Sequence, residues 1–167
     1  MFAVNARALI ERERDGITEL VLQTRVKPNE PEGLELPGGR LELFEPILTG
    51  LRREIYEETG LTDVRVIGEE TRMDSLGTGA YYEVECIQPF AVFQTLAGPV
   101  DCTGAYFLCQ ADGPLLPNGD ASKNVHWRSV DEIRQMMEQD PAQFAGVDRV
   151  GIQFYLAQRN IKRRVID

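Results

Sequence analysis

Three glutamates in the middle of the chain have the spacing of one helix face. Glu54, Glu57 and Glu58 stand at i, i+3 and i+4, which a helix of 3.6 residues per turn places side by side. Like charges at this spacing repel one another unless a cation neutralises them. A hard divalent cation such as Mg²⁺ would do so, because it takes oxygen ligands and often bridges carboxylates to phosphates. The alternative is a solvated acidic face on a surface helix, which the three glutamates alone would favour.

The residues around these glutamates favour the metal site. Arg53 precedes Glu54 directly and can pair with Glu45 near the start of the same helix. Residues 37–39, Pro-Gly-Gly, end a predicted strand and let the backbone turn tightly beside the helix. Glu42 lies between this turn and the helix, within reach of the same region.

The helix that must carry the glutamates is predicted over residues 46–59. Pro46 suits a first helical turn, where its missing N–H is no loss, and Gly60 suits the C-terminal cap. Gly50 costs about 1 kcal/mol relative to alanine inside a helix, so we expect the helix to pack closely against a strand there. Apolar residues recur at steps of three and four and form one face: Ile47, Leu48, Leu51 and Ile55.

The rest of the chain predicts a mixed sheet with helices packed on it. Residues 2–13 and 17–26 read as a β-hairpin joined at Asp15-Gly16. Further strands are expected at residues 34–36, 64–70, 81–94, 104–110 and 125–127. Helices are expected at residues 130–138, capped by Ser129, and at 147–159, with Val147, Val150, Phe154 and Ala157 on one side. This is an α+β sandwich, predicted as a single domain over residues 1–167.

Composition excludes several classes of partner. The net charge of −9 repels the backbone of DNA or RNA, so no long nucleic acid is expected as a partner. It also repels free polyphosphates, so a phosphate site needs metal ions or a basic cluster. Residues 1–7 do not begin a signal peptide, and no run approaches the roughly 18 apolar residues of a membrane span. We expect a cytoplasmic protein with no membrane partner and with reduced thiols at Cys86, Cys102 and Cys109.

The stretch from residue 39 to 61 resembles the Nudix box of the Nudix (MutT-like) hydrolases. That pattern is Gly, five residues, Glu, seven residues, Arg-Glu, an aliphatic, any residue, Glu-Glu, any residue, Gly and an aliphatic. Its fixed positions are all matched, by Gly39, Glu45, Arg53, Glu54, Ile55, Glu57, Glu58, Gly60 and Leu61. Residues 34–38 and the order of predicted elements extend the resemblance, whereas Phe44 stands where many members have glycine.

The resemblance implies a Nudix fold, in which a mixed β-sheet lies between helices and the box forms a loop-helix-loop. It implies that the three glutamates bind Mg²⁺ or Mn²⁺. Arg53 and Glu45 would hold the helix and its glutamates in place, with Gly60 as a structural residue of the box. Gly38 and Gly39 would supply backbone groups near the metals and the substrate.

The implied reaction is attack of water on a phosphorus of a nucleoside diphosphate linked to another moiety. The substrate would be a small nucleotide: a nucleotide sugar, a nucleoside triphosphate or a dinucleotide. The implied catalytic residues are Arg53, Glu54 and Glu57, with Glu54 a metal ligand first and the general base second. The alternative is a catalytically silent Nudix-fold module that senses a nucleotide, against which the intact box argues.

Several residues outside the box are weaker candidates. Glu83, Glu85 and Asp120 could each be a further metal ligand or a solvated surface acid. Arg25 and Lys27 could meet substrate phosphates or end a solvated strand.

Aromatic residues after the box have two interpretations. Stacking on a base is one, but core packing is expected for at least two of Tyr81, Tyr82, Phe90 and Phe93. His126 is expected to be structural. Because many Nudix relatives pair through sheet edges or N-terminal strands, a homodimer is an expectation by analogy.

Overall fold

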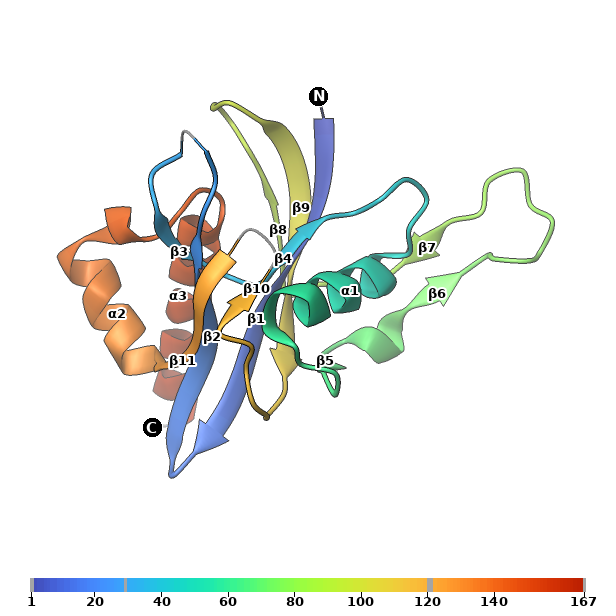
Figure 1. Ribbon diagram of the computed structural model, residues 1–167. Helices are drawn as coiled ribbons and strands as arrows, with labels where there is room; N and C mark the ends of the chain where they lie inside the picture. The colour runs from blue at the N-terminus through green and yellow to red at the C-terminus, as the bar shows by residue number, and fades with distance from the viewer. Residues whose placement is uncertain (1, 29, 120–121, 167) are drawn as a thin grey trace.

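The computed structural model describes residues 2–28, 30–119 and 122–166, and it has a mixed sheet with helices on both faces (Figure 1). Nine of the described strands form one sheet in the order β10-β11-β2-β1-β9-β5, with β3 beside β2, β4 beside β1 and β8 beside β9. β1 runs parallel to β9 and antiparallel to β2. The expected α+β arrangement is therefore confirmed.

The elements have the following bounds. The strands are β1 (Phe2–Arg14), β2 (Ile17–Arg25), β3 (Gly33–Glu35), β4 (Gly38–Arg40), β5 (Arg65–Val66), β6 (Met73–Asp74), β7 (Glu85–Cys86), β8 (Ala91–Gln94), β9 (Asp101–Gln110), β10 (Asn118–Gly119) and β11 (Ser122–Ser129). The helices are α1 (Ile47–Thr59), α2 (Val130–Gln139) and α3 (Asp148–Ile166), with 3₁₀ turns η1 (Glu69–Thr71) and η2 (Pro141–Gln143). No helix in the described residues is long and apolar enough to cross a membrane.

The alternation of side chains along β1 creates two hydrophobic cores. Ala8 and Ile10 face α1, where they pack with Leu51 and Ile55. Leu9 points to the opposite face, where side chains of α2 and α3 cover the sheet. Helices therefore cover both faces of the sheet: α1 packs on one face, and α2 and α3 pack on the other.

Local signals fix the turns and helix ends as expected. Asp15 and Gly16 both have positive φ, 52° and 77°, which matches the tight hairpin between β1 and β2. Gly60 ends α1 at φ 77°, and its N–H donates to the carbonyl of Tyr56 at 2.9 Å. Ser129 caps α2 in a capping box with Glu132.

The expectation for Gly50 was wrong about its neighbour. A Cβ at Gly50 would lie 2.4 Å from Leu41 Cδ2 and 2.7 Å from Glu45 Oε2. The residues packed closely against Gly50 therefore belong to the loop that precedes α1 and not to a strand.

Two predicted strands are shorter than expected. In place of a strand over 64–70, β5 ends at Val66, and Gly68 at φ 89° turns the chain into η1. In place of a strand over 81–94, the structure has β7 and β8, separated by Pro89, which lacks the N–H that a sheet ladder needs.

The buried face of the last helix also differs from the prediction. Val150 is 63% exposed and Phe154 44% exposed, while the face that packs on the sheet is Asp148, Gly151, Ile152, Tyr155 and Leu156. The reason is Asp148, a buried acid that pairs with Arg7 of β1 and sets the rotation of α3. Cys102 and Cys109 are buried and Cys86 is exposed, all three as free thiols.

Candidate functional site

Arg53 joins the acidic residues of α1 to the loop that precedes the helix. Its Nε and Nη2 donate to the two carboxylate oxygens of Glu45 at 2.9 and 3.0 Å. Its Nη1 donates to Glu54 at 2.8 Å and to Glu57 at 3.2 Å. The hydrogen bonds from Arg53 lower the pKa of Glu45. Glu45 and Arg53 therefore stand as the sequence predicts, one bidentate pair beside two of the glutamates.

The Gly38-Gly39 turn meets α1 at two of its glutamates. Gly38, at φ 126°, donates its N–H to Glu58 Oε2 at 2.8 Å. A Cβ on Gly39 would lie 2.5 Å from Glu54 Oε2, so the missing side chain leaves the space that this carboxylate occupies. β4 pairs with β1, which places both glycines on the sheet.

Arg7 of β1 donates hydrogen bonds to this turn, a role that was not predicted from the sequence. Its guanidinium is buried, and it donates to the carbonyls of Leu36, at 2.6 Å, and Gly38. The same group pairs with Asp148, with Nε at 3.0 Å from Oδ1, and with Glu35 at 3.5 Å. A charged residue between Ala6 and Ala8, inside the buried stretch of β1 that ends at Ile10, was the available signal.

Glu58 is a buried carboxylate with an altered acidity. Removal from water raises its pKa to about 7, although the charge of Arg7 and the N–H of Gly38 act in the opposite direction. Burial likewise raises the pKa of Asp148, against the effect of Arg7. A further cation beside Glu58 would favour its ionised form.

The donor set fits a hard divalent cation. In the part of the chain that the structure describes, no three His, Cys, Asp or Glu side chains converge as a ready metal cage. Glu54 and Glu57 instead pair with Arg53, whose positive charge partly neutralises theirs. The three carboxylates, on neighbouring turns of α1, are nevertheless the kind of oxygen ligand that Mg²⁺ and Mn²⁺ prefer.

The candidate acids outside the box lie elsewhere. Glu85 accepts the N–H of Ile47 at 2.6 Å and pairs with Arg72 at 2.8 Å. Glu83 accepts the N–H of Gly77 at 2.8 Å, within the loop between β6 and β7. Neither is brought to the three glutamates. Asp120 lies outside the described residues.

The candidate substrate-binding residues are only partly free. Arg25 is half-buried, with Nε 2.7 Å from Glu30 and Nη1 3.0 Å from Glu35. Lys27 is exposed. Because Glu35 also contacts Arg7, Arg25 belongs to the same charge network as the glycine turn.

Two of the four aromatic residues pack as the core interpretation predicts. Phe90 contacts Tyr155 at a centroid distance of 6.2 Å, and Phe93 stacks obliquely on Tyr106 at 4.8 Å. Tyr81 and Tyr82 are instead 93% and 75% exposed and meet edge to face.

The ring nitrogens of His126 contact residues of its own strand, β11. Its Nδ1 lies 2.6 Å from the carbonyl of Asn124, and its Nε2 accepts from Arg128 at 3.2 Å. These contacts are consistent with the expectation that His126 is structural, which stays a prediction.

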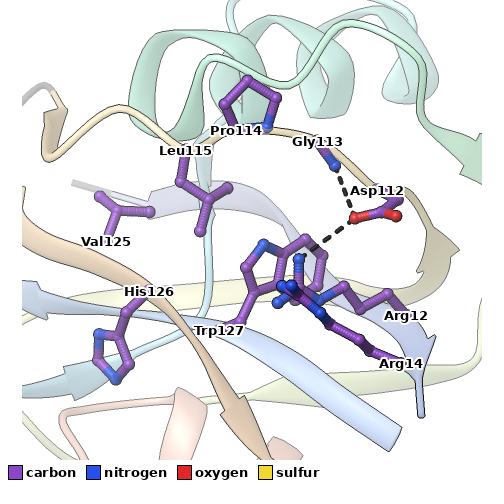
Figure 2. Close-up of a pocket in the computed structure, with 9 residues that line it drawn as sticks. All are labelled: Arg12, Arg14, Asp112, Gly113, Pro114, Leu115, Val125, His126 and Trp127. Atoms are coloured by element: carbon purple, nitrogen blue, oxygen red, sulfur yellow. Dashed lines mark hydrogen bonds and ion pairs between the residues drawn. The ribbon is translucent and has the colours of Figure 1, made fainter.

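A cavity of about 690 Å³ lies at the far end of the hairpin, lined by β1, β11 and residues 112–115 (Figure 2). The guanidinium of Arg12 lies 4.2 Å over the Trp127 ring and pairs with Asp112 and Glu19. Along β1, Arg12 is five residues beyond Arg7, roughly 16 Å from the glycine turn. Because of this distance, and because Arg12 already pairs with two acids, the cavity is not part of the acidic site.

Comparison with known proteins agrees with this geometry. A protein of Streptomyces ambofaciens described as MutT-like is 33% identical over 103 residues, which cover 62% of this chain and 52% of that protein. The chain thus spans about half the length of this relative. Two solved structures share the fold at low identity. A possible asymmetric diadenosine tetraphosphate hydrolase of Jonesia denitrificans has a TM-score of 0.65, 16% identity and 94% coverage of both chains.

The second is the NUDIX domain of Shewanella oneidensis NrtR, solved with ADP-ribose. It has a TM-score of 0.61 and 12% identity, and covers 96% of this chain and 89% of that one. The family model described as the NUDIX domain matches residues 1–146, from the start of β1 through η2. Since that match includes the glycine turn, α1 and most of the sheet, the chain belongs to the NUDIX family.

Proposed function

We propose that the protein is a metal-dependent pyrophosphohydrolase acting on a nucleoside diphosphate linked to another moiety. The observation that carries the proposal is the fit between the glycine turn and α1. Gly39 leaves the space that the Glu54 carboxylate fills, and Gly38 donates to Glu58. A solvated acidic face on a surface helix needs neither contact. The two contacts therefore support the proposal that these glutamates form a binding site.

Each residue of this site has a proposed part in the reaction. Glu54, Glu57 and Glu58 would hold Mg²⁺ or Mn²⁺, which when bound neutralises phosphate oxygens and lowers the pKa of water. Glu54 is also the proposed acceptor of the proton of the attacking water, because its carboxylate lies next to Gly39, in the space that a side chain there would fill. Arg53, held by both oxygens of Glu45, keeps Glu54 and Glu57 oriented.

The substrate is proposed to be a small nucleotide. Arg25 would contact a substrate phosphate after exchanging one of its two carboxylate partners. The relatives named above make ADP-ribose and a dinucleotide the first compounds to test, followed by nucleotide sugars and nucleoside triphosphates.

The experiment is a hydrolysis screen with and without Mg²⁺, using wild type and the variants Glu57→Gln and Glu58→Gln. Wild type should hydrolyse at least one compound only with the metal, and both variants should lose turnover while circular dichroism shows them folded. Glu83→Gln changes an acid whose carboxylate accepts the N–H of Gly77 in the loop between β6 and β7; it is the matched control and should act like wild type. Wild-type rates in both variants would refute the metal site, and metal-supplemented binding without turnover would favour the nucleotide-sensing alternative.

A further inference from the structure

Helix α1 begins without a cap of its own. Its N-cap residue is Pro46, which has no side-chain acceptor, and the first turn contains no acidic residue. The first N–H groups of any helix lack partners inside the helix. A side-chain acceptor at this position normally stabilises the helix, as Ser129 does for α2.

The missing acceptor is supplied by another part of the chain, Glu85 of β7. Its Oε1 accepts the N–H of Ile47, the first residue of α1, at 2.6 Å. Its Oε2 accepts from Arg72 Nε at 2.8 Å, and the side chain is 16% exposed. A negative charge at this end of a helix is also favourable to the helix dipole. Glu85 thus caps the glutamate-bearing helix from a distance of 38 residues in sequence.

The same carboxylate ties a projecting arm to α1. Residues 73–86 form a two-stranded arm that extends away from the main sheet beside the start of α1 (Figure 1). Arg72 pairs with both Glu85 and Asp74, which face each other across β6 and β7. An isolated two-stranded hairpin is marginally stable, so anchorage at its base determines where the arm lies.

We propose that Glu85 is a positioning residue that fixes the first turn of α1 and, through it, the placement of Glu54. Glu54 is seven residues along the helix from Ile47, roughly 10 Å, so a change in the direction of the helix at its first turn shifts Glu54 relative to Gly39. This inference rests on the proposed function, and it gives Glu85 a role different from the metal ligation considered for it from the sequence.

Three variants separate positioning from ligation. Glu85→Gln keeps an oxygen for the N–H of Ile47, Glu85→Ala removes it, and Arg72→Gln removes the arm's ion pairs while leaving the cap. The readouts are hydrogen exchange of the first-turn amides, Mn²⁺ binding by calorimetry, and kcat and KM on the best wild-type substrate. Exchange and Mn²⁺ binding need no turnover, so they decide this inference even if the proposed hydrolysis fails.

Glu85→Ala should speed exchange of the first-turn amides roughly fivefold. It should also weaken Mn²⁺ binding by about 10-fold or more and lower kcat more than it raises KM. Glu85→Gln should restore most of each property, and Arg72→Gln, which loosens the arm but keeps the acceptor, should speed exchange less than Glu85→Ala does. If Glu85→Ala folds poorly, the double variant Pro46→Ser/Glu85→Ala supplies a local cap and should recover slow exchange. Equal loss of Mn²⁺ binding in Glu85→Gln and Glu85→Ala with unchanged exchange, or wild-type behaviour of Glu85→Ala, would overturn the proposal.

Discussion

Gly38 and Gly39 are neighbours, yet alanine at each should damage the protein in a different way. Gly38 has φ 126°, a conformation strained for any residue with a Cβ. A Cβ there would lie 2.4 Å from the carbonyl oxygen of Ala6 and 2.8 Å from the Cα of Arg7. Both are backbone atoms of β1, so relief of the clash requires movement of the sheet.

At Gly39 the backbone φ is ordinary, and the conflict is with a side chain. Its Cβ would lie 2.5 Å from Oε2 and 2.6 Å from Cδ of Glu54. The end of a glutamate can rotate away, so Gly39→Ala should keep the fold and displace one proposed metal ligand.

The magnitudes separate the two variants clearly. The strained backbone of Gly38→Ala costs about 1–3 kcal/mol, and the steric conflict adds about 1–3 kcal/mol. Even about 3 kcal/mol in total lowers the melting temperature of a chain this size by about 6–12 °C. Gly39→Ala should cost less than Gly38→Ala, about 1 kcal/mol, because the end of a flexible glutamate and not the backbone has to move. Its Mn²⁺ affinity and turnover should fall about 10- to 100-fold.

Thermal unfolding by circular dichroism and calorimetric titration with Mn²⁺ measure the two effects separately. Gly77→Ala is the control for backbone strain alone, because Gly77 has φ 72° and nothing within 4 Å of an added Cβ. It should lose about 1–2 kcal/mol and keep Mn²⁺ binding. Equal losses of melting temperature in Gly38→Ala and Gly39→Ala would refute the reasoning, as would wild-type Mn²⁺ binding by Gly39→Ala.

Two further predictions concern pH and a helix cap. Burial raises the pKa of Glu58 to about 7 from 4.5, so between these values the folded state holds a proton that the unfolded state has released. The free energy of unfolding of metal-free protein should therefore decrease as pH rises from about 5 to 7, and a urea-unfolding series in Glu58→Gln that kept this slope would contradict the assignment. Ser129→Ala removes the hydrogen bond from the N–H of Glu132 and should cost about 1 kcal/mol, with turnover unchanged; a loss of turnover would show that α2 reaches the site.

The sequence was sufficient where a feature depends on nearby residues. The end of α1 at Gly60, the cap at Ser129 and the hairpin at Asp15-Gly16 each follow from residues within a few positions. The pairing of Arg53 with Glu45 was predictable for the same reason, since the two are eight residues apart and α1 begins between them.

Features that depend on distant partners were missed or placed wrongly. The buried face of α3 is set by the pair between Arg7 and Asp148, which are 141 residues apart. The cap of α1 comes from Glu85, whose position depends on how the arm leaves the sheet. Local hydrophobic patterning predicts neither the burial of a charged residue nor a helix cap that comes from a distant strand. Each depends on a partner far away in the sequence, which the local pattern does not contain.

The charges explain why this site is suited to a cation. Six described carboxylates at the glycine turn and α1 interact with three arginines, while Arg40 and Arg52 lie on the same two elements and Arg52 pairs with Glu69. The carboxylates are Glu35, Glu45, Glu54, Glu57, Glu58 and Asp148, and the arginines are Arg7, Arg25 and Arg53. A nucleotide phosphate brought to this surplus would be repelled, on a chain that already has a net charge of −9. In the proposed function, a divalent cation would relieve the repulsion among the glutamates and would then attract the phosphate, so the imbalance that disfavours the metal-free site would add to the affinity for the metal.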